Sequence, residues 1–96
     1  MASTEATVDS ATAEGLSLYG YPQCPYCSRV LAAIDSLGIE VPLRNTMQDG
    51  DYREAVRAAT GRGTVPVLRI EEPNGEIEWL SESADIVRYL ISRFGG

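Results

Sequence analysis

Two cysteines separated by two residues are the side chains in this sequence best suited to chemistry. Cys24 and Cys27, in the segment Cys-Pro-Tyr-Cys, are the only cysteines among 96 residues, and the sequence contains no histidine. Thiols at this spacing can close a disulfide across the first turn of a helix, and a thiolate can attack another disulfide. Without histidine as a general base, such a nucleophile must be activated by its own surroundings. We therefore predict a redox-active dithiol.

Two structural roles compete with this interpretation. A structural disulfide at this spacing would stabilise little, because so short a loop hardly restricts the unfolded chain. A zinc site needs about four ligands, and the sequence offers no further cysteine and no histidine to complete one. Both roles are weaker hypotheses than a catalytic pair, and no metal is expected.

A strand, a loop and a helix are predicted around the two cysteines. Residues 16–19 alternate like a short strand, and residues 20–23 have the composition of a loop. Apolar residues between positions 28 and 37 then follow one helical face: Val30, Leu31, Ile34 and Leu37. Cys24 therefore lies near a helix N-terminus, where free backbone N–H groups and the helix dipole favour a thiolate over a thiol.

The remaining elements complete one small domain. The pattern predicts a strand over 39–43 at a sheet edge, a helix over 51–60 capped by Asp51, and a strand over 66–70. A turn at 73–75 leads to a strand over 77–79, and a last helix, capped by Ser81 or Ser83, ends near Phe94. The residues expected to face inward from the two later helices are Tyr52, Ala55, Val56 and Ala59, and Ile86, Val87, Leu90 and Ile91. The order β-α-β-α-β-β-α outlines the thioredoxin-like fold, an α/β protein with a four-stranded mixed sheet flanked by helices.

The composition limits the classes of binding partner and the cellular location that the sequence predicts. Fourteen acidic against eight basic residues give a net charge of −6, which disfavours nucleic acid and anionic membranes as partners. No apolar run approaches the roughly 18 residues that a membrane crossing needs. Residues 1–14 have the composition of a disordered tail and lack the features of a secretory signal, so the domain is expected over 15–96 in a cytoplasmic protein. In a reducing cytosol, Cys-x-x-Cys is more often catalytic than structural.

Beyond these patterns, residues 16–94 resemble a glutaredoxin of the dithiol type. The resemblance rests on Cys-Pro-Tyr-Cys at the first helix, Thr64-Val65-Pro66 before the third strand, and the final helix after the hairpin. It implies a monomeric, glutathione-dependent thiol-disulfide oxidoreductase that reduces disulfide-bonded or glutathionylated proteins. Cys24 would be the nucleophile, Cys27 the resolving thiol and glutathione the co-substrate.

The same resemblance implies roles for further residues. Tyr26 would line the glutathione groove, and the Thr64-Val65-Pro66 segment would contain a cis-proline that lets the Val65 backbone pair with a substrate cysteine. Arg62 would bind the glycine carboxylate of glutathione, with Arg44 as a weaker candidate. Glutaredoxins usually have a lysine where this sequence has Tyr21. Activation of Cys24 is therefore left to the helix end and, as a weaker candidate, to Arg29.

Residues 79–86 depart from the glutaredoxin pattern. They are closer to the Glu-Ser-x-x-Ile pattern of the N-terminal domain of glutathione transferases, in which this helix start holds the γ-glutamyl end of glutathione. Ser83 and the backbone N–H groups would then take its carboxylate, and Glu82 or Asp85 its ammonium. Simple helix capping is the alternative role for Ser83, and both roles can hold together.

Two other functions remain open from the sequence. The protein could be a thioredoxin-like reductant served by a flavoprotein reductase, although the Trp and Gly-Pro of a thioredoxin turn are absent. It could instead be an iron–sulfur carrier that uses the nucleophile and glutathione as cluster ligands. Pro25 is expected to disfavour cluster assembly.

Overall fold

The structure, a computed structural model, describes residues 14–95 of the chain, so the predicted tail lies outside the described residues except for Glu14. The described residues form seven elements in the predicted order β-α-β-α-β-β-α. They are β1 (Leu16–Gly20), α2 (Pro25–Leu37), β2 (Leu43–Asn45), α3 (Gly50–Thr60), β3 (Val67–Glu71), β4 (Ile77–Leu80) and α4 (Ser83–Phe94). Among them, no helix combines the length and the apolarity that a membrane crossing requires.

The strands form one mixed sheet in the order β2-β1-β3-β4. β1 runs parallel to β2, with Leu18 opposite Leu43, and antiparallel to β3, with Leu18 opposite Leu68. β3 and β4 form an antiparallel hairpin, whose turn contains Gly75 with a φ of 93°. This is the predicted thioredoxin-like sheet, with β1 at its centre and β2 at one edge.

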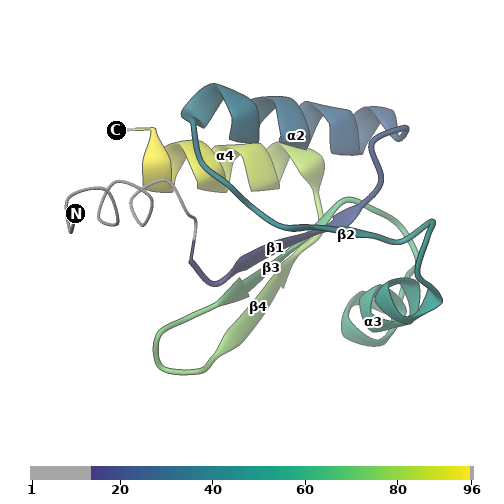
Figure 1. The fold of residues 1–96 in the computed structure, drawn as a ribbon. Coiled ribbons are helices and arrows are strands. Elements are labelled where there is room, and N and C mark those ends of the chain that lie inside the picture. The colour runs from purple at the N-terminus through teal and green to yellow at the C-terminus, as the bar shows by residue number, and fades with distance from the viewer. Residues whose placement is uncertain (1–13, 96) are drawn as a thin grey trace, which may run out of the picture.

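Helices cover both faces of the sheet, with α2 and α4 side by side on one face and α3 on the other (Figure 1). Residues of β1 alternate between the two layers, as the period of a strand requires. Leu16 and Leu18 pack with α2 and α4, whereas Tyr19 packs with Val56 of α3 and Val67 of β3. The larger core lies between the sheet and the α2–α4 pair, and its fully buried members are Leu18, Val30, Leu68, Ile70, Ile86 and Leu90.

The second strand lies further along the chain than predicted. It spans Leu43–Asn45 rather than residues 39–43, and only an isolated bridge at Glu40 precedes it. Pro42 has no N–H to donate to a ladder, so its contribution is the carbonyl, which accepts from the N–H of Leu18 at 2.9 Å. The predicted edge position is confirmed.

Two predicted helix caps are wrong. The cap of α3 is Asp49, whose side chain accepts from the backbone N–H of Asp51 at 2.9 Å, because the helix begins one residue earlier than predicted. The N-cap residue of α4 is Glu82 rather than Ser81 or Ser83, and it makes no capping hydrogen bond with its side chain.

Two predicted core positions are also wrong. Ile91 is 54% exposed and Ala59 is exposed. Ile91 follows Ile86 by five residues, which on an α-helix rotates it by about 140° from that buried side chain. The inward stripe of α4 is therefore narrower than the run of apolar residues suggests.

Candidate active site

Cys24 lies where the chain passes from the end of β1 into α2. It is the N-cap residue of the helix, and Pro25 occupies the first turn, where a missing N–H costs nothing. The loop before the helix is closed by a hydrogen bond from the Cys24 N–H to the Tyr21 carbonyl at 3.2 Å. The predicted strand–loop–helix setting is therefore present, with both thiols free.

The two thiols differ in burial and in pKa. Cys24 is 8% exposed and Cys27 is fully buried. Burial by itself raises the pKa of Cys24, but the backbone N–H of Cys27, the Cys27 thiol and the N–H of Tyr26 favour the thiolate, and the net pKa is lowered. Burial raises the pKa of Cys27 to about 11; the N–H of Tyr21 opposes this, and the neighbouring Cys24 adds to it. Cys24 therefore ionises first, and Cys27 keeps its proton at neutral pH.

The donors at Cys24 are those that the helix position predicts. As a thiol, Cys24 makes no close capping hydrogen bond; the helix-end N–H groups of Tyr26 and Cys27 instead stabilise its ionised form. Arg29 is exposed and is not among the groups that lower the pKa of Cys24. Activation thus comes from the helix end and from the second thiol rather than from a nearby cation.

The loop before β3 faces the dithiol. The Val65–Pro66 peptide bond is cis, as predicted, and Pro66 is buried while Val65 is half-buried. Thr64 and Val65 line two adjacent grooves, one on each side of this loop. The cis-proline loop therefore separates and borders both surfaces on which a substrate could lie.

The first of these, the α4 groove, lies between the cis-proline loop and the start of α4 and has a volume of about 290 Å³. Its lining includes all but one of the predicted glutathione-binding residues, together with Ser81: Tyr26, Arg62, Thr64, Val65, Pro66, Ser81, Glu82 and Ser83. The exception is Asp85, which lies outside this lining. Its carboxylate accepts a hydrogen bond from Arg88 at 3.0 Å on the exposed surface of α4.

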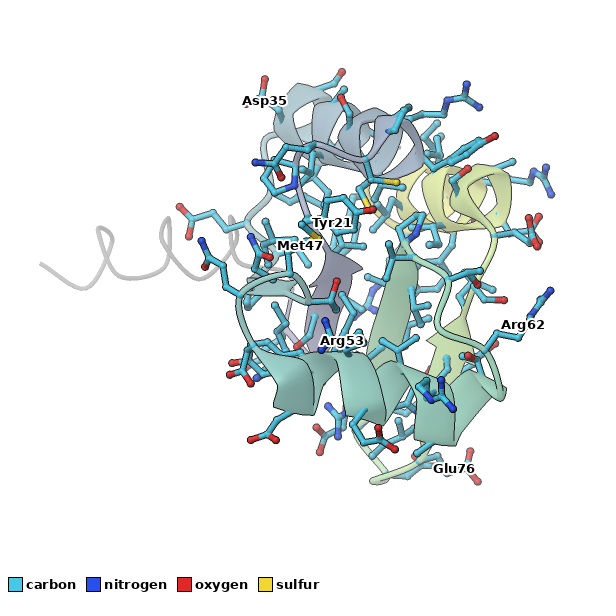
Figure 2. All side chains as sticks on the ribbon, turned by 90° about the vertical axis from the view of Figure 1, so that its right-hand side faces the viewer. Tyr21, Asp35, Met47, Arg53, Arg62 and Glu76 are labelled. Atoms are coloured by element: carbon cyan, nitrogen blue, oxygen red, sulfur yellow. The ribbon has the colours of Figure 1, made fainter. Side chains whose placement is uncertain are left out.

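The second, the Tyr21 groove, has a volume of about 380 Å³ and includes the nucleophile itself. It is lined by Tyr21, Cys24, Thr46, Met47, Arg53, Gly63, Thr64 and Val65. Figure 2 shows Tyr21, Met47 and Arg53 gathered on one side of the molecule, with Arg62 well apart from them. Arg53 is therefore the cation of this groove, and Arg62 is the cation of the other.

Sequence reasoning missed Thr46, Met47 and Arg53, because neither their residue types nor their local spacing singles them out. A usable signal was present in the strand pairing. Parallel strands have their carboxyl ends at the same edge of a sheet, so the residues after β2 must lie beside those after β1. The Thr46 N–H indeed donates to the Gly20 carbonyl at 3.0 Å, and Arg53 Nη1 donates to the Thr46 carbonyl at 3.3 Å.

Arg44 lies away from both grooves, on the face of the sheet that α3 covers. Its guanidinium is 5.9 Å from the ring centre of Tyr19 and 5.4 Å from that of Tyr52. Its Nε is buried without a hydrogen-bond partner. The guanidinium is thus engaged in cation–π contacts rather than placed for a ligand at the dithiol. Within residues 14–95, no three or more Cys, His, Asp or Glu side chains gather as metal ligands would.

Solved structures similar to this chain include glutathione transferases and a maleylacetoacetate isomerase. Maleylacetoacetate isomerase from Anaeromyxobacter dehalogenans, solved with dicarboxyethyl glutathione and citrate bound, is 29% identical over 83% of this chain and 37% of its own, with a TM-score of 0.64. A glutathione transferase from Populus trichocarpa is 28% identical over 84% of this chain and 37% of its own, with a TM-score of 0.66. A serine-to-cysteine variant of another poplar glutathione transferase is 25% identical over 86% and 37%, with a TM-score of 0.69.

The chain thus spans a little over a third of the length of these proteins. Comparison with curated protein sequences gives no match. Residues 18–96 match the family described as glutathione S-transferase, N-terminal domain, which covers every element from the middle of β1 onward. With this match and the thioredoxin-like sheet, the chain belongs to the glutathione S-transferase N-terminal domain family.

Proposed function

We propose that this chain is a glutathione-dependent thiol-disulfide oxidoreductase of the glutaredoxin type, built on a glutathione transferase N-terminal domain. The observation that carries the proposal is the difference in pKa between the two thiols. Cys24, at a helix N-terminus, has a lowered pKa, and the fully buried Cys27 within hydrogen-bonding reach of it has a pKa raised to about 11. Disulfide exchange requires an attacking thiolate, and a second thiol beside it can resolve the mixed disulfide that forms.

The reaction begins when the Cys24 thiolate attacks the glutathione sulfur of a glutathionylated protein. The substrate disulfide breaks, the protein thiolate leaves and takes a proton from water, and a Cys24–glutathione disulfide forms. A second glutathione thiolate then attacks this disulfide, which releases oxidised glutathione and restores Cys24. No histidine is needed, because the helix-end donors hold the thiolate ready.

Protein disulfides take a second route through both thiols. Attack of Cys24 on such a disulfide leaves the substrate attached to Cys24 and frees one substrate thiol. Cys27 then loses its proton, attacks Cys24 Sγ and expels the second substrate thiol, so that the substrate is reduced by two electrons and the Cys24–Cys27 pair is oxidised. Two glutathione molecules return the pair to its reduced form.

The α4 groove supplies a site for the γ-glutamyl end of glutathione. The Glu82 side chain makes no capping hydrogen bond, so the first-turn N–H groups of α4 stay open to a carboxylate. Glu82 and Ser83 both line the groove, and Thr64 and Val65 continue its lining toward Cys24. Since Asp85 pairs with Arg88 outside this groove, Glu82 is the better candidate for the ammonium group.

Two arginines compete for the glycine carboxylate. The γ-glutamyl and glycine ends of glutathione extend in opposite directions from its cysteine. With the γ-glutamyl end in the α4 groove and the sulfur at Cys24, the glycine end extends into the Tyr21 groove, where Arg53 is the cation. Arg62, the residue that the resemblance to glutaredoxins implies, lines the α4 groove instead. Alanine variants of the two arginines distinguish these placements.

The proposal is tested by reduction of a mixed disulfide between glutathione and a small thiol, with glutathione, glutathione reductase and NADPH present. We expect NADPH consumption that requires both glutathione and Cys24. Activity with a flavoprotein thioredoxin reductase, and none with glutathione, would overturn the proposal in favour of a thioredoxin-like reductant. Visible absorbance from a cluster in freshly purified protein, without turnover, would favour an iron–sulfur carrier.

A further inference from the structure

The thiol of Cys27 is held in a narrow space at the end of β1. Its side chain is fully buried, and the backbone of Tyr21 and the neighbouring Cys24 both influence the pKa of its sulfur. The resolving sulfur therefore has a defined position, fixed from the strand side by residues 20 and 21 and from the helix side by its own place in the first turn of α2.

The absence of a side chain at Gly20 provides the space that Cys27 Sγ occupies. A Cβ atom built on Gly20 would lie 2.5 Å from Cys27 Sγ, closer than real Cβ atoms approach any neighbour. The next atoms, Cys27 Cβ at 3.5 Å and Val65 Cβ at 3.7 Å, would be in ordinary contact. Gly20 is not among the glycines with a positive φ, so its backbone conformation is open to other residues. The requirement for glycine comes from one atom, the resolving sulfur.

We propose that Gly20 is a positioning residue for the second thiol: its missing side chain creates the place from which Cys27 Sγ reaches Cys24 Sγ. The importance of this sulfur position for turnover rests on the proposed function. The position of Cys27 Sγ against Gly20 does not depend on it. In the step concerned, Cys27 gives up its proton, its sulfur bonds to Cys24 Sγ, the Cys24–substrate disulfide breaks, and the substrate leaves as a thiolate that takes up a proton.

A side chain at position 20 should slow this step far more than the first attack. To reach van der Waals contact with a new methyl group, Cys27 Sγ must withdraw by about 1 Å, and a misplacement of that size costs up to about 100-fold in rate. No atom of Cys24 is among the three nearest to the added Cβ. The two backbone donors to the Cys24 thiolate, from Tyr26 and Cys27, therefore remain in Gly20→Ala, and only the donor from the displaced Cys27 thiol is weakened.

Dithiobis(nitrobenzoate) separates the two steps without requiring glutathione or a reductase. Attack by Cys24 releases one coloured thiolate, and closure by Cys27 releases the second. In Gly20→Ala we expect the first release to be at least as fast as in Cys27→Ala, which lacks the same thiol donor to Cys24, and the second to be slowed by about 10-fold to 100-fold relative to the wild type. Gly50→Ala is the matched control, since a Cβ there would meet nothing closer than Arg53 Nη2 at 3.7 Å. A second release as fast in Gly20→Ala as in Gly50→Ala would overturn the proposal.

The Cys27→Ala variant shows whether Cys27 Sγ is the atom with which a side chain at position 20 collides. Cys27→Ala removes Sγ, so adding Gly20→Ala to it should leave the urea midpoint and the Cys24 release rate almost unchanged. If Gly20→Ala fails to fold alone but folds in the Cys27→Ala background, the proposal is supported. If the double variant is as destabilised as Gly20→Ala, the conflict lies elsewhere and the proposal fails. Neither outcome depends on glutathione turnover, so failure of the proposed function would be seen separately.

Discussion

Removing the thiol of Cys27 should raise the pKa of Cys24. The Cys27 side chain is one of three donors that favour the Cys24 thiolate, and the other two, the N–H groups of Cys27 and Tyr26, belong to the backbone. Cys27→Ala deletes only the first of these. The substitution therefore measures how much of the activation comes from the second thiol rather than from the helix end.

The expected size follows from the kind of hydrogen bond that is lost. Hydrogen bonds to charged groups contribute about 1.5–3 kcal/mol, and a thiol is a weak donor, so the lower end of this range applies. About 1.4 kcal/mol corresponds to one pH unit. We expect the pKa of Cys24 to rise by about one pH unit in Cys27→Ala. Cys27→Ser keeps a hydroxyl donor and should stay close to the wild type.

Ultraviolet absorbance of the thiolate against pH, checked by the pH dependence of alkylation by iodoacetamide, measures this change. In the wild type, the pKa of Cys27 near 11 keeps its titration apart from that of Cys24. A pKa of Cys24 in Cys27→Ala equal to or below the wild-type value would refute the reasoning. It would mean that the bulk of the second thiol, by excluding water, opposes ionisation as strongly as its hydrogen bond favours it.

Three further predictions concern the site. Cys24→Ser should abolish reduction of mixed glutathione disulfides in the NADPH-coupled assay, while Cys27→Ser should retain it and lose reduction of protein disulfides; equal loss in both variants would contradict the glutathione route. Arg53→Ala should weaken glutathione binding by about 1–3 kcal/mol in calorimetry, because Arg53 is the cation of the groove into which the glycine end extends, with Arg57→Ala as the surface control; loss in Arg62→Ala alone would place the glycine carboxylate in the α4 groove. Urea unfolding of the reduced protein should show a Cys27-dependent stability that is full below pH 9 and is lost by up to roughly 3 kcal/mol as pH rises toward 11, because the folded pKa is the higher one. Cys27→Ser should lack this loss.

The local parts of the molecule could be predicted from the sequence. The spacing of Val30 and Ile34, the Pro25 that starts a helix, and the glycines that end helices are signals contained within a few residues. They were enough to place Cys24 at a helix N-terminus and to give the order of the seven elements. The cis peptide bond at Pro66 followed from the resemblance to glutaredoxins, and the structure confirms it.

Features that depend on contacts between residues far apart in the chain were decided only by the tertiary structure. The second strand begins at Leu43 because of its pairing with β1, and this pairing brings Thr46 and Arg53 beside Cys24. The outward position of Ile91 and the space that Gly20 leaves for Cys27 likewise depend on how α4 and α2 pack on the sheet. Periodicity reports which face of an element is apolar, but it does not report which residues meet across elements. The dithiol was therefore readable in the sequence, whereas its second groove and the place of its resolving sulfur required the packed fold.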